Sequence, residues 1–408
     1  MHLQKARQNN FVAVVAAAAA AALMAGCASS SASSGDPASS ASLNVGIITI
    51  NSGPYAAISK ESIEAADVTA KELNAAASNK YKIHIVDIDT DGTPSETLQA
   101  VEQAAQSGGV RFVSGFFTSD TAPAVNSQAR RLGILVLAAV AQSADLVGSN
   151  CSPNYFQFDA VDSQYALADK TVLAAAHIPT WDAISEDYAA GQNKVSTFGS
   201  QVNSLGEKMK TSVFPPLGST DDGTQITQLM HSPAEGLFIA MLGADAVTLA
   251  KQGAQFGLFP KFKFIISSGY LQQPLLSAMG DAVVGTHEVL NYSPDAVAKT
   301  QFAKDYGAID KTGLWHVPIS GNLALTMLDD AANKARSTQI SAIATALSGL
   351  SANTIVGPVT MRAADHLLLQ PLYPAQAVKG PNGPELVVDS EIPASQVTPP
   401  VSPSCHMH

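Results

Sequence analysis

The feature that most constrains the fold is an alternation, from residue 43 onward, between short apolar runs and longer amphipathic stretches. Short runs bounded by turn residues are typical of buried strands, and the longer stretches have the spacing of helices. Strand–helix–strand repetition of this length predicts a parallel sheet with helices on both faces. In the first half we expect strands at 43–50, 83–88, 110–113 and 134–138, separated by helices at 58–74, 94–106 and 121–132.

The alternation resumes after residue 158 and predicts a second α/β set. Its expected elements are helices at 164–176, 195–206, 225–230 and 246–256, strands near 183, near 213, at 237–242 and at 262–266, two late helices at 323–335 and 338–350, and a hairpin turning at 380–384. Two doubly wound sheets in succession predict a two-lobed α/β protein. Ligands of such sheets bind outside the carboxyl ends of the strands, so we expect the site in the cleft between the lobes.

Composition excludes several classes of protein. The formal charge of −11 argues against nucleic-acid binding, because phosphates require a basic face. With 46% apolar and 14% charged residues, the body of the chain can bury a core and is not disordered. After residue 27 no apolar run reaches the roughly 20 residues that a membrane span needs.

The amino terminus has the pattern of an export signal. Lys5 and Arg7 precede an apolar stretch at 11–24, which predicts a signal peptide over residues 1–27. The stretch ends in Met24-Ala25-Gly26-Cys27, which resembles the lipobox of bacterial lipoproteins, a family in which the cysteine carries a lipid. The alternative is an ordinary secretory signal with a chance cysteine. Residues 28–42 are rich in Ser and Ala and predict a flexible tether.

Two cysteines remain if Cys27 carries a lipid. In an oxidising compartment such a pair tends to form a disulfide, so we expect Cys151 to bond with Cys405. That bond would hold the Pro-rich tail at 396–408 against the body of the protein. The alternative is two separate thiols, one buried and one in a frayed tail.

Signatures of catalysis are missing from the sequence. There is no G-x-S-x-G, G-x-x-x-x-G-K, H-E-x-x-H or C-x-x-C motif, and no G-x-G-x-x-G follows the first strand. The scattered histidines, the alternating acids Asp87, Asp89 and Asp91, and the terminal Cys405-His406 pair favour structural or solvated roles. We therefore expect no enzyme activity, no cofactor and no metal site.

Small polar residues at three strand–helix junctions are the remaining candidates for a site. Ser119 follows the third predicted strand, where free backbone N–H groups suit an anionic or polar ligand group, although simple helix capping explains it too. The second junction, at 139–143, offers backbone groups and the amide of Gln142. The third, at 186–191, carries Tyr188, which either covers a ligand with its ring or is an exposed turn residue.

These junctions lie where the chain resembles type I periplasmic solute-binding proteins of ABC importers, in their branched-chain amino-acid group. The similar motifs, in order, are Ser52-Gly53-Pro54, Gly115 with Ser119, Gly133-Ile134, Asp187-Tyr188 with Gly191, Gly357-Pro358-Val359-Thr360 followed by Arg362, Asp365 and His366, and Gln370-Pro371-Leu372-Tyr373. Each motif is weak alone, but their order and spacing are fairly specific. The likeness spans residues 43–388.

The resemblance implies two Rossmann-like lobes joined by a hinge of three crossings, near 159–162, 286–291 and 360–366. Lobe 1 would comprise residues 43–160 and 288–362, and lobe 2 residues 161–287 and 363–395. The implied function is capture of a small solute by hinge closure and its delivery to a membrane permease with its ATPase subunits. A sensor for an amide or aromatic acid, which passes closure to a signalling partner, is the alternative.

The resemblance also implies the residues of the site. Ser119 and the backbone of Val140, Ala141 and Gln142 would hold a ligand carboxylate, and Tyr188 would cover it from the other lobe. An acid that meets the ligand's amino group is expected just after the strand at 262–266, but the sequence there is Ser267-Ser268-Gly269-Tyr270. Ser268 and Asp245 are therefore the candidates, or else the solute is an amide, an aromatic acid or another organic compound.

Overall fold

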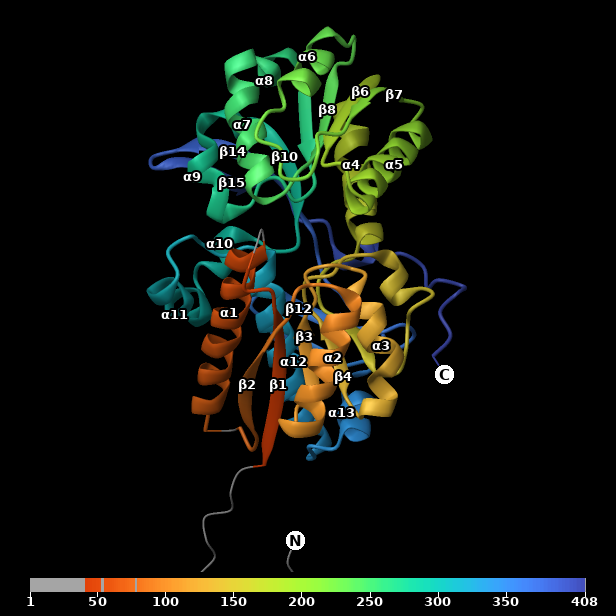
Figure 1. Ribbon diagram of the computed structural model, residues 1–408, viewed down its shortest axis with the longest axis vertical. Coiled ribbons are helices and arrows are strands. Elements are labelled where there is room, and N and C mark those ends of the chain that lie inside the picture. Colours follow the sequence, from red (N-terminus) through yellow and green to blue (C-terminus); the bar gives the residue numbers. More distant parts are fainter. Residues whose placement is uncertain (1–40, 53–54, 78, 408) are drawn as a thin grey trace, which may run out of the picture. The chain divides into compact units, whose positions relative to one another are not determined.

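Two large β-sheets organise the protein, and Figure 1 shows each with its helices. This computed structural model describes residues 41–52, 55–77 and 79–407. The first sheet has five parallel strands in the order β2-β1-β3-β4-β5. Its strands are β1 (Ser42–Thr49), β2 (Lys82–Asp89), β3 (Phe112–Gly115), β4 (Leu135–Ala138) and β5 (Tyr155–Gln157).

The second sheet has seven strands in the order β15-β14-β10-β9-β8-β6-β7. Five of them run parallel, whereas β14 pairs antiparallel with both β10 and β15. These strands are β6 (Thr180–Ser185), β7 (Lys208–Val213), β8 (Gly236–Ala240), β9 (Phe264–Ser267), β10 (Thr286–Leu290), β14 (Tyr373–Gly380) and β15 (Gly383–Val388).

Helices connect the strands of both sheets. Those of the first half are α1 (Ala56–Ala75), α2 (Pro94–Ser107), α3 (Thr121–Leu132), the 3-10 helix η2 (Ala144–Val147), α4 (Asp162–Ala176), α5 (Ala189–Ser204), α6 (Gly223–His231) and α7 (Gly243–Phe256). The later ones are α8 (Leu258–Lys261), η3 (Gln273–Leu275), α9 (Leu276–Met279), η4 (Gly280–Val283), α10 (Pro294–Val297), α11 (Gln301–Ile309), α12 (His316–Ala335), α13 (Ile340–Leu347) and α14 (Ala394–Val397).

The five-stranded sheet is buried on both faces. Val45 and Ile47 belong to the core cluster that includes Leu323 of α12, whereas Ile48 packs on the opposite face with Val125 of α3. All of these side chains are at most 3% exposed. Near-continuous apolar strands of this kind need helices on both faces, which is why the alternating sequence pattern folds into a doubly wound sheet. The predicted fold class, α/β with two Rossmann-like lobes, is confirmed.

The chain changes sheet three times, and we call the five-stranded part lobe 1 and the seven-stranded part lobe 2. It leaves lobe 1 between β5 and β6, returns between β10 and α11, and leaves again between β13 and β14. A small antiparallel sheet, β11 (Ser351–Thr354), β12 (Gly357–Met361) and β13 (Leu368–Leu369), precedes the third passage. The lobe limits predicted from the sequence lie close to these passages and stay predictions.

Strand β10 was not expected, because its residues were assigned to a crossing. Its sequence interrupts the apolar pattern with Thr286 and Glu288, yet both side chains are buried, at 0% and 7% exposure. Polar residues can occupy a central strand when hydrogen bonds satisfy them, as they do for Glu288. The small sheet β11-β12-β13 and the three-residue strand β5 were also absent from the sequence prediction.

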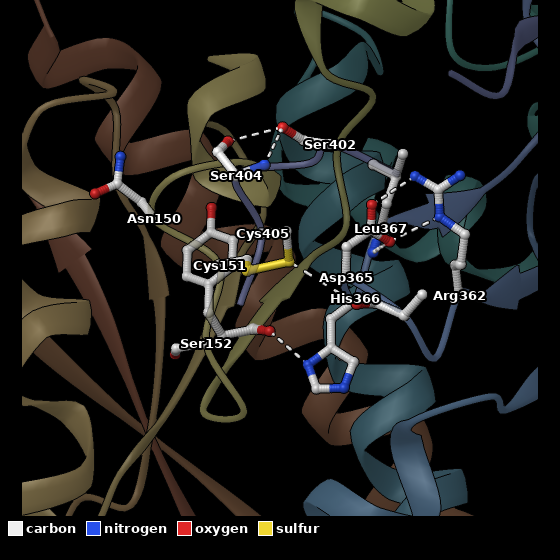
Figure 2. Close-up of a disulfide and its surroundings, with 12 residues drawn as sticks. Asn150, Cys151, Ser152, Arg362, Asp365, His366, Leu367, Ser402, Ser404 and Cys405 are labelled. Atoms are coloured by element: carbon white, nitrogen blue, oxygen red, sulfur yellow. Dashed lines mark hydrogen bonds and ion pairs between the residues drawn. A yellow bond between two sulfur atoms is a disulfide. The ribbon is translucent and has the colours of Figure 1, made fainter. Parts of the chain in front are cut away.

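The C-terminal tail lies against both lobes, and Figure 2 shows its end at the disulfide. Val397 of α14 is fully buried and packs with Ala168 of α4 in lobe 2. Farther along, Cys405 forms a disulfide with Cys151, which lies between η2 and β5 of lobe 1; their Cα atoms are 5.5 Å apart. The Arg362 guanidinium donates to the Pro399 carbonyl at 2.6 Å. The tail therefore ends in lobe 1 after packing on lobe 2.

Several sequence predictions concern residues beyond the part that is described. The signal peptide at 1–27, the lipid attachment at Cys27, most of the tether at 28–42 and the motif residues Gly53 and Pro54 lie outside the described residues. Ser42 is already the first residue of β1. In the described part of the chain, none of the helices is both long and apolar enough for a bilayer span.

Candidate functional site

A cavity of about 560 Å³ opens where the carboxyl ends of both sheets meet. Lobe 1 contributes Tyr55, which follows β1, and Phe117, which follows β3. Lobe 2 contributes Tyr188 after β6 and Leu242 after β8. In each sheet these two strands are neighbours whose connections run in opposite directions, so the cavity lies at both topological switch points. Open α/β sheets bind their ligands at such points.

Another hollow, of about 720 Å³, lies at the opposite edge of lobe 1. It is lined by Ser42 at the start of β1, Asn154 just before β5 and Gln339 just before α13. Although it is larger, it meets the amino ends of the strands, and its lining residues all come from lobe 1. We therefore assign the functional site to the inter-lobe cavity.

Most of the cavity wall is apolar or aromatic. Six aromatic rings line it: Tyr55, Phe117, Tyr165, Tyr188, Tyr292 and Trp315. Burial raises the pKa of Tyr188 well above its usual value, and Glu186 reinforces this effect. Both effects keep the hydroxyl neutral, so Tyr188 offers a ring face and a hydrogen bond rather than a charge.

Five of the seven predicted ligand-binding residues line this cavity: Val140, Gln142, Tyr188, Asp245 and Ser268. Ser119 and Ala141 are not part of the wall. The Ser119 hydroxyl accepts a hydrogen bond from the Ser143 backbone N–H at 3.3 Å, and the Ala141 carbonyl accepts from the Gln157 amide at 2.7 Å. Both residues therefore shape the loops behind the wall, and their ligand contacts stay predictions.

The polar members of the predicted set already have protein partners. Gln142 donates to Asp159 at 3.2 Å, and Ser268 accepts from the Lys194 ammonium at 3.0 Å. Asp245 accepts from the Gly218 backbone N–H at 2.7 Å. Each side chain is thus held in one orientation before a ligand arrives, which lowers the entropic cost of binding.

Asp159 connects the first two passages between the lobes. It is fully buried and accepts from the Ala160 backbone at 2.7 Å and from the Asn291 amide at 2.8 Å. Its other oxygen lies 2.8 Å from Nδ1 of His316, at the start of α12. Asp159 lies in the first passage, and Asn291 directly follows β10 in the second. This carboxylate therefore links the two passages to each other. A buried charge with four partners is satisfied and holds these passages in fixed register.

Glu288 is the acid that sequence reasoning missed. It comes from β10, beside β9, and its carboxylate accepts from the Ser267 hydroxyl at 2.6 Å and from the backbone N–H groups of Gly269 and Leu271 at 3.0 and 2.9 Å. A carboxylate therefore lies beside the residues that follow the strand at 262–266, although it comes from the neighbouring strand. The one signal for it in the sequence is a single charge in a short apolar run.

Apart from Glu288, the cavity wall contains two carboxyl groups whose pKa values are raised. Glu186 is 1% exposed, and burial raises its pKa to about 7 although the Leu242 backbone N–H donates to it at 2.6 Å. Its second oxygen is buried without a hydrogen-bond partner. Burial also raises the pKa of half-buried Asp169 on α4 to about 7, and the nearby Lys194 ammonium offsets only part of this effect. Both groups can exchange a proton near neutral pH.

This arrangement offers binding groups rather than a reacting pair. Lys194, the basic group beside Ser268, also lies 3.5 Å from the Asp162 carboxylate, so it serves as an ion-pair partner. His316 faces Asp159 and not a serine or cysteine. A mostly apolar cavity with a few fixed polar groups is the usual form of a small-molecule binding site.

Comparison with known proteins agrees with this geometry. The periplasmic binding protein family matches residues 42–382. A Leu/Ile/Val-binding protein homolog from Brucella melitensis is 26% identical over 220 residues, which is 53% of this chain and 58% of that protein. The matched part thus spans little more than half of this relative's length.

Two solved structures illustrate the shared fold. A Leu-, Ile-, Val-, Thr- and Ala-binding protein from Brucella ovis, in a closed conformation, superposes with a TM-score of 0.79 at 19% identity, covering 90% of this chain and 99% of that one. A solute-binding protein of an ABC transporter from Rhodopseudomonas palustris, bound to 3,4-dihydroxybenzoic acid, superposes with a TM-score of 0.78 at 18% identity, covering 86% of this chain and 98% of that one. With the family match covering most of its length, this chain belongs to the periplasmic binding protein family.

Proposed function

We propose that this protein is the extracytoplasmic solute receptor of an ABC importer. It captures a small amino acid or a related organic solute in the inter-lobe cavity and delivers it to a membrane permease. The observation that carries this proposal is the composition of the cavity wall, because Tyr55 and Phe117 come from lobe 1 whereas Tyr188 and Leu242 come from lobe 2. A solute that contacts both walls binds the closed form better than an open one and so shifts the population toward closure.

The hydrogen bonds around Asp159 support closure by rotation at the hinge. Asp159 ties the first passage to Asn291 of the second. The third passage is tied in by the Gln370 amide, which donates to the Phe158 carbonyl at 3.4 Å. Because these bonds lie within the passages, each lobe can rotate as a rigid body while the hinge keeps its contacts. Such hinge closure is a common response of two-lobed proteins to a ligand.

Export and anchoring complete the proposal. The signal at residues 1–27 would direct the chain out of the cytoplasm, and a lipid on Cys27 would keep it near the permease. In the producing cell, replacement of Cys27 by Ser would then move the protein from the membrane fraction to the soluble fraction.

The test of solute capture uses the cavity tyrosine. A thermal-shift screen against amino acids, amides and organic acids should find solutes that raise the melting temperature, because they bind only the native state. We expect Tyr188→Ala to weaken binding of such a solute about tenfold or more, through loss of its ring. Tyr188→Phe keeps the ring and separates its contribution from that of the hydroxyl. Unchanged affinity in Tyr188→Ala would place the binding site elsewhere.

A further inference from the structure

The charges of the cavity wall are strongly unbalanced. Among the described residues that line it, four carry carboxyl groups and one carries an ammonium group: Asp169, Glu186, Asp245, Glu288 and Lys194. The ammonium is already engaged, since it donates to Ser268 at 3.0 Å and lies 3.5 Å from Asp162. A solute carboxylate entering this cavity would therefore meet excess negative charge and no uncommitted cation of the wall.

The four carboxyl groups differ in how many partners they have. Glu288 accepts three hydrogen bonds, and Asp245 and Glu186 accept one each from a backbone N–H. Asp169 differs, because within the described part of the chain no hydrogen-bond donor reaches its carboxylate. It lines the cavity, is half-buried, and follows Tyr165 by one helical turn of α4. A half-buried carboxyl that lines the cavity without a protein donor can accept a hydrogen bond from a ligand in place of water.

Resting on the proposed function, we propose that the solute is an organic cation, an amine or related nitrogen base with an apolar or aromatic body and no free carboxylate, and that Asp169 anchors its charged group. The aromatic wall suits both parts of such a molecule. Tyr165 and Tyr188 line the cavity, and aromatic rings both attract a cation and bury an apolar body.

The position of the predicted carboxylate-binding groups supports this choice. Ser119 lies outside the cavity wall and its hydroxyl already accepts from the Ser143 backbone. Gln142 directs its amide N–H group toward Asp159. These two lobe 1 side chains are thus committed elsewhere, whereas acceptors on lobe 2 remain. In the described part of the chain the backbone N–H groups of residues 140–142 donate to no acceptor, so the carboxylates of the probe panel test them directly.

Ionisation of Asp169 gives the proposal a distinct pH signature. Burial raises the pKa of this group to about 7; Glu288 of β10 and Asp162 of α4 act in the same direction, and Lys194 of α5 opposes them. Tyr165, on the same helix, stays neutral because burial raises its pKa. Affinity for an ammonium solute should therefore rise as the pH increases through about 7, whereas affinity for a carboxylate solute should fall.

The experiment compares probes of similar size and different charge. Thermal shift and calorimetry on the purified protein would use panels of amines, amides, carboxylates and amino acids, headed by benzylamine, benzamide, benzoate and leucine. We expect hits among the amines, with affinity that increases from pH 6 to pH 8. Asp169→Asn should weaken them about tenfold and remove the pH dependence. Asp295→Asn, on an exposed residue of α10, is the control that changes the same charge elsewhere.

The outcomes separate this inference from the proposed function. Binding of carboxylates or amino acids in preference to amines would overturn the cationic class while leaving solute capture intact. Absence of binding in every panel would contradict solute capture itself. If Asp169→Asn does not fold, the pH profile of the unmodified protein decides, because affinity for the best amine that falls with rising pH excludes Asp169 as its anchor.

The C-terminal tail carries a second, independent inference. Val397 is buried against α4 of lobe 2, and Pro399, two residues later, accepts from Arg362 at 2.6 Å on the lobe 1 side. Arg362 is itself held by two hydrogen bonds to buried Asp365, at 2.7 and 2.5 Å (Figure 2). Two residues span at most about 7 Å. The tail thus joins the lobes by a very short segment whose end is held through Cys405 and Cys151.

We infer that this tail is a fourth, disulfide-anchored crossing that limits how far the lobes open. Small-angle scattering of the solute-free protein well below its melting temperature tests it. We expect a larger radius of gyration in Cys151→Ser/Cys405→Ser, with faster hydrogen exchange at 394–407. Val397→Ala weakens the lobe 2 contact and keeps the disulfide. It should also increase the radius of gyration and the rate of hydrogen exchange at 394–407. A lower melting temperature with an unchanged radius in both variants would mean that the disulfide only stabilises the fold.

Discussion

The two walls of the cavity differ in kind. Lobe 1 presents uncharged side chains, such as Tyr55, Phe117 and Gln142, and the imidazole of His316 there faces Asp159. Lobe 2 presents the carboxyl groups, such as Asp169 and Glu186. The difference indicates a division of roles, in which lobe 1 supplies shape and apolar area and lobe 2 sets the charge that a solute must match. Substitutions in the two lobes should therefore have different consequences.

The largest effect is expected from Glu288→Ala in lobe 2. The change removes the acceptor of three hydrogen bonds and leaves the backbone N–H groups of Gly269 and Leu271 without this acceptor, whereas the Ser267 hydroxyl keeps the His287 carbonyl at 3.1 Å. We expect a loss of about 3 kcal/mol in the free energy of unfolding, measured by urea denaturation. Glu288→Gln keeps an acceptor and should cost less. An equal loss of unfolding free energy in the two variants would show that the acceptor oxygens of Glu288 do not account for its contribution to stability.

One glycine near the strand ends of each lobe gives the next comparison: Gly115 is the last residue of β3, and Gly191 lies in the first turn of α5. A Cβ on Gly115, which has a φ of +107°, would lie 2.6 Å from the Ile48 carbonyl, and one on Gly191 would lie 2.4 Å from the Glu186 carbonyl. We expect Gly115→Ala and Gly191→Ala each to destabilise the fold by about 2 kcal/mol, because backbone must move. Calorimetry should show weaker solute binding mainly for Gly191→Ala, which displaces Glu186 and Tyr188. An equal loss of affinity in both would contradict the division of roles.

The smallest effect concerns the pH dependence of Glu186. Its folded-state pKa of about 7 lies above the unfolded value of about 4.3. The contribution of Glu186 to stability is therefore fully present below a pH of about 4.3 and is lost as the pH rises through 7. Glu186→Gln cannot ionise. The free energy of unfolding of this variant, measured by urea denaturation, should therefore exceed that of the unmodified protein by about 1 to 2 kcal/mol at pH 8, and by less at pH 5.

Glu61 of lobe 1 is the matched control for this variant. Burial also raises its pKa to about 7, and it accepts from the Trp315 indole N–H at 2.5 Å, but it does not line the cavity. Glu61→Gln should reproduce the change in stability without altering the preference among charged solutes. A change of preference in Glu61→Gln, and none in Glu186→Gln, would reverse the roles assigned to the two lobes.

Much of the fold could be predicted because its signals are local. Strands β1, β2 and β4 and helices α1 to α3 lie within a few residues of their expected positions. Helix α3, for example, ends at Leu132 with left-handed Gly133 as its cap, directly before the strand entry that the Gly-Ile motif predicts. Strand β10 was missed because three of its five residues are polar, and the partners that satisfy the Glu288 carboxylate lie at and after the end of β9.

The candidate site was only partly predictable for the same reason. Strand ends identified Tyr188 and Gln142, since residues after parallel strands meet at one edge of a sheet. Asp169 was missed because it lies within a helix, where a single acid in an amphipathic sequence is indistinguishable from a solvated one. Ser119 shares the strand-end pattern, but its hydroxyl is directed to the Ser143 backbone.

The sequence alone determined the alternation of strands and helices over most of the chain, the two α/β sets and the pair of cysteines available for a disulfide, because these follow from periodicity and composition along the chain. The tertiary structure decided which side chains share the cavity. Glu288 meets Gly269 from a different strand, and Asp159 meets Asn291 across 132 residues. Such contacts depend on how strands are ordered within a sheet and how the lobes pack, and no local pattern encodes either.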